Sequence, residues 1–449
     1  MKIPSIASLF FRCSPLLPLF LIQACGGGSD DTTPITTPDP TEYTFVLSSV
    51  LTNKCGVESP FTNVELLIQD DSWQITDRFT PDANGQITFT TLNETINYTL
   101  VAEQQVGSGV QGLNIESVLQ AKAASPVKFI GIYEELTAQS SCECVTQNVS
   151  ISHRSFNTRS QVTSSLSYSS WEAIDSNTTL FTDVEACRET NTDWPLHSFS
   201  IDGTDINDAS IGNAVFSDNF DANIDQVWEL SAFDVSAQID LPAIHQAFET
   251  HQIIQSNNHF SSLVNEDDTS IMIFNSHNYI GETAYFSKAQ VVFEETSSIF
   301  GSSIIESYHQ ISSANFDNSF SIQAQTVKPE IDEVNFSEIQ ADGSYDYSVV
   351  TNYPMAIIRF NYEVLNAQSQ LINVNWTTYG PIEGLLPITT SLVGYEDFIT
   401  TDSDWNEIDV QLLQSASTSD YNDYVRHYQG STVNNIDDDL STYHIQIKK

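Results

Sequence analysis

The sequence predicts an all-β protein of several domains, built of tandem β-sandwich modules with one short helix. From residue 43 onward, short apolar runs alternate with turn-forming residues about every ten positions. The runs have the length of strands and are rich in β-branched residues, which favours strands over helices. A mature chain of about 400 residues exceeds what one hydrophobic core usually serves, so more than one domain is expected.

The first module is expected at 43–105, where the strand pattern is clearest. Asn84 and Gly85 lie between two apolar runs, and this pair supplies the positive φ angles of a tight hairpin turn. The predicted strands of the module cover 43–51, 64–68, 73–79, 86–90 and 98–102.

Several short segments of this module match a known pattern. They are Cys55-Gly56, Pro60 ahead of 63–66, Thr80 with 82–89, and 97–100. With these segments the module resembles the carboxypeptidase regulatory-like family. The resemblance implies a transthyretin-like β-sandwich that serves as a structural adaptor or binding unit and has no catalytic residues.

The remainder of the chain is also expected to be β-rich. Residues 106–145 are expected to connect the modules, with a short helix or linker at 113–121. Two β-rich domains are predicted at 146–330 and 331–449, with the boundary near residue 330. The predicted strands cover 145–151, 162–168, 228–241, 271–274, 284–293, 345–350, 355–364, 371–376, 408–413 and 443–447.

The one short helix is predicted at 242–251. Pro242 suits the first turn of a helix, where the missing N–H is not needed. Ile244, Ala247, Phe248 and His251 then recur at helical spacing.

Residues 1–24 are expected to form an export signal. Lys2 and Arg12 are its charged residues, and a short apolar run at 16–22 precedes Ala24. This run is far shorter than the roughly 20 residues that span a bilayer, so a retained transmembrane helix is not expected. The stretch at 25–42 is rich in Gly, Thr, Asp and Pro and is expected to form a flexible linker.

The segment Leu21-Ile22-Gln23-Ala24-Cys25 resembles a lipobox, the signal-peptidase II site of bacterial lipoproteins. The resemblance implies cleavage before Cys25, a diacylglycerol on its sulfur and an acyl chain such as palmitate on its amino group. Gly26 directly after this cysteine implies sorting to the outer membrane, facing the periplasm or the cell surface. The alternative is an ordinary secretory signal with a chance cysteine.

The chain is strongly acidic, with a formal net charge of -44. Loss of residues 1–24 removes two basic and no acidic residues, which changes the charge from -44 to -46. Such a surface repels phosphate backbones, so nucleic acid is excluded as a partner. It also disfavours binding to anionic lipid, which leaves lipid on Cys25 as the expected link to the membrane.

Four cysteines remain when Cys13 in the signal and Cys25 are set aside. An even number in an exported chain predicts two disulfides. A bond between Cys142 and Cys144 would close a very tight ring, so Cys55 is expected to pair with one of them and Cys187 with the other. Zinc bound by four thiolates is the alternative, although the spacing lacks two short paired knuckles.

Candidate ligand-binding residues are few. Trp194 and Trp405 stand in polar contexts and are the tryptophans expected to be exposed, where they can stack on sugar rings. No cofactor is expected, apart from loose calcium binding by acidic loops such as 218–225 or 437–439. The series Asp402, Asp404, Asn406 starts like a calcium loop, but Glu407 and Leu413 stand where its glycine and its bidentate acid would be. Four histidines are expected to be ordinary polar residues rather than metal ligands, namely His245, His251, His259 and His277.

The sequence therefore favours a non-enzymatic, lipid-anchored cell-envelope protein. It is expected to act as a binding or scaffold module for a polysaccharide or a protein. The alternative is an exported carbohydrate-active or metal-dependent hydrolase of unfamiliar type, which requires carboxylates or histidines that converge in a pocket.

Overall fold

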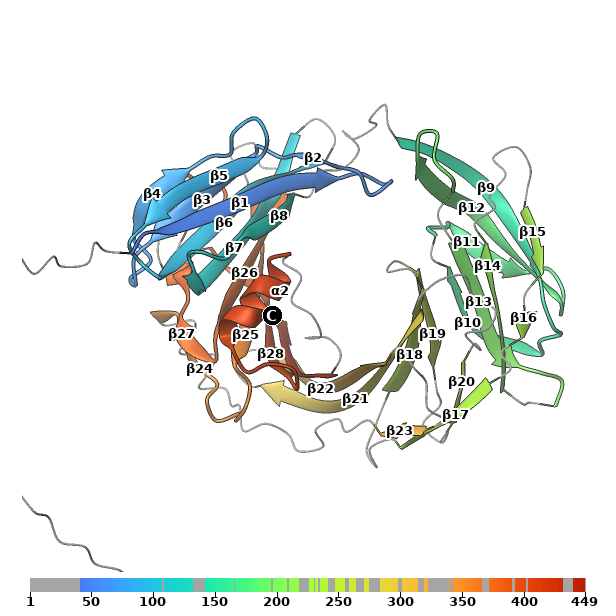
Figure 1. The fold of residues 1–449 in the computed structure, drawn as a ribbon. Coiled ribbons are helices and arrows are strands. Elements are labelled where there is room, and N and C mark those ends of the chain that lie inside the picture. The colour runs from blue at the N-terminus through green and yellow to red at the C-terminus, as the bar shows by residue number, and fades with distance from the viewer. Residues whose placement is uncertain are drawn as a thin grey trace, which may run out of the picture. The chain divides into compact units, whose positions relative to one another are not determined.

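Strands make up most of the described chain (Figure 1). The expected signal, Cys25 and nearly all of the expected linker lie outside the described residues. For the strands between residues 210 and 321, the structure describes the backbone and its pairing, and the side chains are left aside. The computed structural model describes residues 41–106, 109–131, 142–164, 166–194, 197–207 and 210–217, shorter strand segments between 226 and 321, and residues 339, 342–365, 371–389, 392–400, 403–430 and 439–448.

The all-β class with one short helix is confirmed. The helix with described bounds is α2 (Tyr421–Tyr428), and a 3-10 turn, η2, covers Pro387–Thr389. The strands are β1 (Tyr43–Thr52), β2 (Glu58–Pro60), β3 (Val64–Gln69), β4 (Ile75–Phe79), β5 (Gln86–Thr91), β6 (Thr95–Val106), β7 (Gly109–Lys122), β8 (Val127–Gly131), β9 (Cys142–Ser152), β10 (Thr158–Ser164), β11 (Ser170–Ala173), β12 (Thr178–Glu189), β13 (His197–Thr204), β14 (Ser210–Ser217), β15 (Gln226–Glu229), β16 (Ser231–Ala232), β17 (Val235–Asp240), β18 (Ala247–Ile254), β19 (Asn258–Leu263), β20 (Ser270–Ile273), β21 (Thr283–Ser297), β22 (Gly301–Ser313), β23 (Ser319–Ser321), β24 (Ser344–Asp346), β25 (Met355–Leu365), β26 (Leu371–Pro381), β27 (Glu383–Leu385), β28 (Trp405–Ser415) and β29 (Asp439–Lys448).

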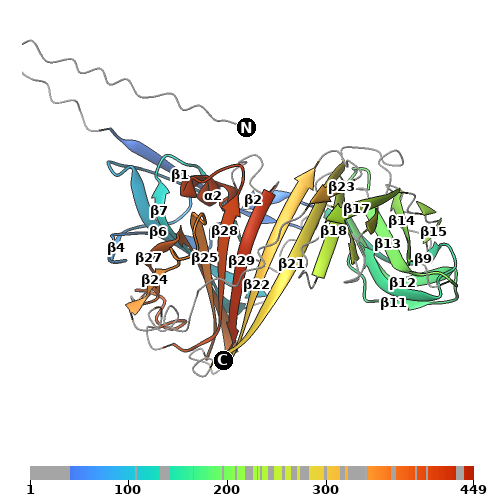
Figure 2. The same cartoon turned by 90° about the horizontal axis from the view of Figure 1, so that it is seen from below.

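A long sheet links much of the chain. Its twelve strands lie in the order β19-β18-β21-β22-β29-β28-β25-β26-β7-β6-β3-β4. Figure 2 shows β28, β29, β22 and β21 side by side in this order. Most neighbours are antiparallel, whereas β26 pairs with β7 in parallel. The sheet therefore joins strands from the first expected module to strands from both expected β-rich domains.

The first module is a β-sandwich whose second layer is this sheet. Strands β2, β1, β5 and β8 form a separate sheet, in which β8 pairs with β1 in parallel. Phe45 and Leu47 from β1 meet Tyr98 and Leu100 from β6 in a buried core. The core forms because alternate residues of each strand point to the same face.

The turn at Asn84-Gly85 differs from the expected hairpin turn. Gly85 alone of the pair has a positive φ, of 74°. The turn connects β4 to β5, and these strands belong to different sheets. The Asp82 carboxylate accepts hydrogen bonds from the backbone N–H groups of Asn84 and Gln86. A side chain at Gly85 would place its Cβ 2.3 Å from the Ser49 carbonyl oxygen, so only glycine fits.

Two expected helices are strands in the structure. Residues 113–121, expected as a helix or linker, lie in β7, which pairs with β6 and with β26. Residues 247–251 of the helix expected at 242–251 lie in β18, which pairs with β19 and β21, and residues 242–246 lie outside the described chain. Pairing along both edges of a strand outweighs local helical spacing, because every backbone N–H and C=O is then satisfied. The expected connection at 106–145 contains both β7 and β8.

The short helix that does form, α2, lies near the C-terminus and was not predicted from the sequence. The Asp420 side chain caps it by accepting a hydrogen bond from the Asn422 N–H. Tyr424 and Val425 are its buried residues, and Tyr424 packs with Met355 and Ile357 of β25. The helix therefore covers part of one face of the long sheet (Figure 1).

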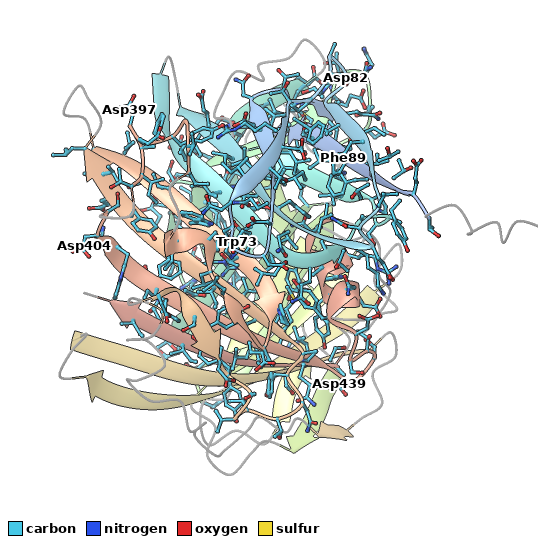
Figure 3. The ribbon with its side chains drawn as sticks, turned by 90° about the vertical axis from the view of Figure 1, so that its left-hand side faces the viewer. Trp73, Asp82, Phe89, Asp397, Asp404 and Asp439 are labelled. Atoms are coloured by element: carbon cyan, nitrogen blue, oxygen red, sulfur yellow. A yellow bond between two sulfur atoms is a disulfide. The ribbon has the colours of Figure 1, made fainter. Side chains whose placement is uncertain are left out.

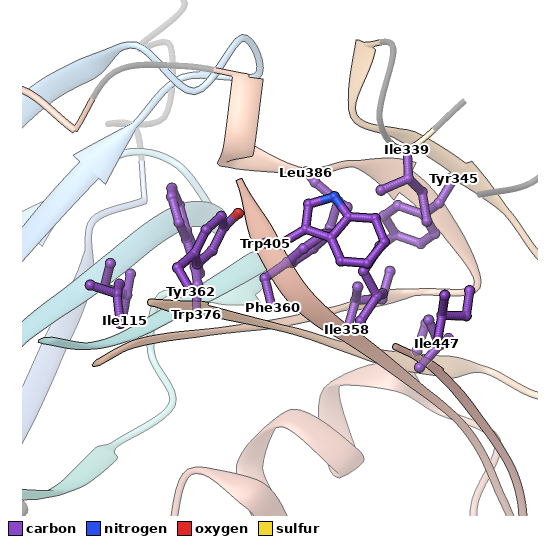
Figure 4. Packing of buried hydrophobic residues seen from close by; sticks show 14 of the residues in the cluster. Ile115, Ile339, Tyr345, Ile358, Phe360, Tyr362, Trp376, Leu386, Trp405 and Ile447 are labelled. Atoms are coloured by element: carbon purple, nitrogen blue, oxygen red, sulfur yellow. The ribbon is translucent and has the colours of Figure 1, made fainter. Parts of the chain in front are cut away.

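The opposite face of the sheet carries the largest core (Figure 4). Ile358 and Phe360 of β25, Trp376 of β26 and Ile447 of β29 pack there beneath the segment that contains Tyr345. The core brings together residues from β3, β6, β7 and the C-terminal strands, so the two ends of the chain share one apolar layer.

A chain of buried hydrogen bonds crosses four strands of the sheet. The Trp376 indole Nε1–H donates to Ser117 Oγ at 2.9 Å, and Ser117 Oγ lies 2.8 Å from Thr99 Oγ1. Thr99 Oγ1 donates to Gln69 Oε1 at 2.6 Å. Because these polar groups are buried, a shift of any strand by one residue would leave them unpaired.

Two further sheets form a second sandwich. One has the order β11-β12-β9-β15 and the other β10-β13-β14-β16. Ile151, Phe181, Phe199 and Ile201 fill the core between them.

The expected disulfide pattern is confirmed. Cys55, between β1 and β2, bonds to Cys142 at the start of β9. Cys144 bonds to Cys187, which lies directly opposite it on β12. The sulfurs are thus engaged in disulfides, which removes the thiolates that the zinc alternative requires.

Gly380 on β26 provides a test of the packing. A Cβ at this position would lie 2.1 Å from the hydroxyl of Tyr345, which donates to the Pro381 carbonyl at 3.0 Å. We expect Gly380→Ala to lower the free energy of unfolding by about 1–3 kcal/mol, because the buried tyrosine must move and lose this bond. Denaturant unfolding measures the change.

Tyr345→Phe supplies the control for this prediction. It removes the clashing oxygen, so Gly380→Ala should cost less in a Tyr345→Phe background than in the wild type. Equal costs in both backgrounds would contradict the proposed contact.

Candidate functional site

Five adjacent strands of the long sheet, β7, β26, β25, β28 and β29, carry polar side chains on the face opposite the large core. Strand β25 shows the cause, since Ile358 and Phe360 enter the core while Arg359 and Asn361 alternate with them and point the other way. Backbone pairing aligns these polar residues into two rows across the strands. The first row is Glu116, Thr377, Arg359, Asp409 and Gln446, and the second is Asn114, Asn375, Asn361 and Glu407.

We call these two rows, together with Gln411 and His444 beside them, the polar face. All of its side chains are partly exposed. Tyr379 adjoins the rows on β26, and its ring stacks on that of Tyr428 from α2 at 6.2 Å. The polar face is therefore bordered by aromatic rings where α2 covers the sheet.

Asp409 is the most connected carboxylate of the polar face. Its Oδ2 lies 2.5 Å from His444 Nε2, and its Oδ1 accepts a hydrogen bond from Gln411 Nε2 at 3.3 Å. The Arg359 guanidinium lies 3.6 Å from Oδ1. The Asp409 side chain is 14% exposed, whereas that of Arg359 is 40% exposed. The guanidinium thus keeps donors directed at solvent.

Glu407 is held by amides. Asn361 Nδ2 donates to Glu407 Oε2 at 3.3 Å, and Gln446 Nε2 donates to Oε1 at 2.5 Å. These bonds hold three side chains from three strands in fixed orientations. A face ordered before binding loses less conformational entropy when a ligand arrives.

Glu116 on β7 has the most perturbed carboxyl group of the polar face. Burial raises its pKa to about 7, while a hydrogen bond from Asn114 and the positive charge of Arg359 act in the opposite direction. Tyr379 is affected in turn, since burial and the nearby Glu116 carboxylate raise its pKa. Glu116 is therefore the group of this face whose charge changes near neutral pH.

Both rows of the polar face contain donors as well as acceptors. Amide, carboxyl, hydroxyl and guanidinium groups can together donate to and accept from many hydroxyl groups. This arrangement suits a ligand that is rich in hydroxyls.

The two tryptophans singled out in the sequence have different positions. Trp405 was expected to be exposed, and this is wrong: it is 6% exposed and lies in the large core (Figure 4). It opens β28 and pairs with Tyr362 beyond a register shift that follows the pair Asn361 and Glu407. This bulge interrupts the alternation of β28, so the Trp405 ring faces the core although Glu407 lies on the polar face. Trp194 is half-buried, with the guanidinium carbon of Arg188 at 4.3 Å from its ring centroid. Among the described tryptophans, Trp171 on β11 is the exposed one, at 39%.

The expected acidic and histidine positions are only partly described. Asp404 and Asp439 are exposed (Figure 3), while Asp402 and residues 218–225, 437 and 438 lie outside the described chain. His251 and His259 fall on neighbouring strands β18 and β19, and His245 and His277 are not described. Within the described part, the side-chain groups near enough to share a metal ion involve disulfide-bonded cysteines.

The polar face was not found from the sequence. The alternation of Arg359 and Asn361 with apolar residues was visible in the predicted strand at 355–364. What could not be read was which strands are neighbours, since β7 and β26 are far apart in the chain.

Comparisons with known proteins find structural alignments of low similarity. No protein family matches the sequence, and no curated protein does. Two B repeat units of the collagen-binding protein of Staphylococcus aureus align at 8% identity and a TM-score of 0.13, over 82% of this chain and 92% of that one. The RrgB pilus protein from Streptococcus pneumoniae aligns at 7% and 0.14, over 76% of this chain and 67% of that one. The Bacteroides ovatus SGBP-B protein of a mixed-linkage glucan utilization locus, solved with a heptasaccharide, aligns at 10% and 0.10, over 90% and 93%. TM-scores this low carry no argument about function.

No helix in the described part of the chain is both long and apolar enough to cross a bilayer.

The raised pKa of Glu116 predicts a specific pH dependence of stability. The folded-state pKa of about 7 exceeds the ordinary glutamate value of 4.5, so the folded chain binds more protons between these pH values. Its contribution to stability is therefore present below about pH 4.5 and is lost as pH rises through 7. We compare the free energy of unfolding of Glu116→Gln with that of the wild type. The difference in favour of the variant should be larger by about 1–3 kcal/mol at pH 8 than at pH 5, a range that allows for the partial exposure of Glu116.

Denaturant unfolding at the two pH values measures this difference. Glu383→Gln, at an exposed site on β27, is the matched control and should follow the wild type. If Glu116→Gln also follows the wild type at both pH values, the perturbed carboxyl group is ruled out.

Proposed function

We propose that this protein is a lipid-anchored protein of the cell envelope that binds a polysaccharide through the polar face. It acts as a binding or scaffold module and does not transform its ligand. The observation that carries this proposal is the polar face itself, with two aligned rows of hydrogen-bonding side chains beside the stacked rings of Tyr379 and Tyr428.

Sugars present hydroxyl groups around their ring and apolar C–H groups on its faces. The side chains of Asn361, Glu407 and Gln446 already hydrogen-bond to one another, so they are oriented before a ligand arrives. The tyrosine rings at the border can contact the apolar side of a sugar. Both features support polysaccharide over a protein partner.

An envelope location is supported by the two disulfides, since such bonds persist in oxidising compartments. The lipobox at 21–25 supports lipid on Cys25. Gly26 supports the outer membrane as the destination. Two or three acyl chains on Cys25 would hold the protein there almost permanently.

One observation favours a second candidate function, an exported carbohydrate-active hydrolase. The pKa of Glu116, at about 7, is in the range that a general acid requires. Release of reducing sugar from a bound polysaccharide would establish this activity, and its loss in Glu116→Gln would assign it.

The lipid anchor leads to a prediction about Cys25. We expect Cys25→Ala, with residues 1–24 replaced by a signal that signal peptidase I removes, to release a folded, soluble protein from the membrane fraction, because lipid on Cys25 is the proposed link to the bilayer. Cell fractionation followed by immunoblotting measures this. A variant still found in the membrane fraction would contradict the proposed anchor.

The polysaccharide site leads to a prediction about Asn361. We expect Asn361→Ala to weaken binding about tenfold, because it loses one direct hydrogen-bonding group and frees the Glu407 side chain. A glycan array followed by affinity electrophoresis measures this. Asn93→Ala, at an exposed turn after β5, is the control and should bind like the wild type. Unchanged binding in Asn361→Ala would remove the polar face as the site.

A further inference from the structure

We propose that the polar face selects neutral polysaccharides, that the bound chain lies across the strands along the two rows, and that its carboxylates exclude anionic polysaccharides. This inference rests on the proposed function and names the ligand class of the same site. The direction of the rows, the bonding of their carboxylates and the charge of the face support it.

The rows define the direction of the ligand. Glu116, Thr377 and Arg359 are successive partners on β7, β26 and β25, and the row continues through β28 to β29. Neighbouring strands lie roughly 4.8 Å apart, so five strands give a row of about 19 Å. A single sugar would contact only a fraction of that length. An extended chain that runs across the strands can contact all of it.

The carboxylates of the face act as hydrogen-bond acceptors. Glu407 accepts from the amides of Asn361 and Gln446, and these amides keep their own oxygens as acceptors. Asp409 accepts from Gln411 and contacts His444 and Arg359. Sugar hydroxyls can donate to such oxygens and accept from the amide N–H groups. A carboxylate or sulfate on a sugar can only accept, and it would face oxygens of its own charge.

The charge of the face reinforces this selection. The carboxylates of Glu407 and Asp409, joined by Glu116 when it is ionised, stand against one guanidinium, that of Arg359. His444 adds positive charge only when protonated. The guanidinium is already paired with Asp409 at 3.6 Å, and the whole chain carries a formal net charge of -44. Both the local and the overall charge therefore repel an anionic polymer.

The net negative charge draws a cationic polymer toward the protein, but the polar face presents a like charge to it at short range. Arg359 is the most exposed of the charged side chains whose exposure is measured on the face, at 40% against 14% for Asp409 and 19% for His444. A positively charged ligand would therefore contact the guanidinium before it reached Asp409. A neutral ligand meets no like charge on the face.

The experiment measures retardation of the full-length protein in native gels that contain a neutral β-glucan, polygalacturonate or chitosan. Runs at low and at high salt separate electrostatic effects from contact effects. We expect the neutral glucan to retard the protein at both salt concentrations. At low salt, binding to polygalacturonate should be at least tenfold weaker than binding to the glucan.

The variant Glu407→Gln/Asp409→Asn tests the role of the carboxylates. Both changes keep the size of the side chain and one of its two acceptor oxygens, and together they remove two negative charges. Thermal unfolding checks that the variant is folded. For each protein we take the ratio of its affinity for polygalacturonate to its affinity for the glucan. We expect this ratio to be at least tenfold higher in the variant than in the wild type. Glu172→Gln on the exposed strand β11, in another sheet, is the control and should keep the wild-type preference.

The outcomes separate the two proposals. Equal binding of glucan and polygalacturonate, preferential binding of chitosan at high salt, or an unchanged preference in the double variant would overturn the charge selection and leave a polysaccharide-binding protein. If none of the polysaccharides retards the wild type and no glycan on the array binds, the proposed function fails as well.

Discussion

The register of the long sheet is the constraint on which the rest of the structure depends. A buried chain of hydrogen bonds from Trp376 through Ser117 and Thr99 to Gln69 crosses four strands and couples the C-terminal strand β26 to the first module. Because each group is buried, slipping one strand would leave several of them unpaired at a cost of about 1–3 kcal/mol each. Gly112 on β7 permits the close approach, since a Cβ there would lie 2.0 Å from the Asn373 carbonyl oxygen.

The same register produces the polar face. With Trp376 and Ser117 fixed in the core, alternation directs Thr377 and Glu116 to the opposite side, where they are partners. That side is covered by the four-stranded sheet near β6 and by α2 near one end of β25, and the polar rows occupy what these elements leave partly exposed. The site thus lies on rigid strands rather than on loops, which keeps its side chains in place before a ligand binds.

The sequence predicted the strands better than their arrangement. The strand expected at 355–364 is β25, and that at 371–376 is the first part of β26, because apolar and polar residues alternate clearly in both. The errors have a common cause. Residues 113–121 and 247–251 were not recognised as parts of strands β7 and β18, and Trp405 was expected at the surface. In each case the observed position depends on strand partners that are distant in the sequence. The polar face depends on the same partners, and single strands could not reveal it.

The scarcity of basic residues shapes the whole surface. Several of the described lysines and arginines form ion pairs between segments far apart in the chain, such as Lys54 with Glu185, Lys122 with Asp420 and Lys128 with Glu58. Partly exposed pairs of this kind contribute only about 0–1 kcal/mol each, so they do little to offset the acidic excess. They do engage cations that would otherwise attract phosphate or anionic sugars. An anionic polymer that approaches this protein is therefore repelled, whereas a neutral one is bound or not according to the hydrogen bonds that surfaces such as the polar face offer it.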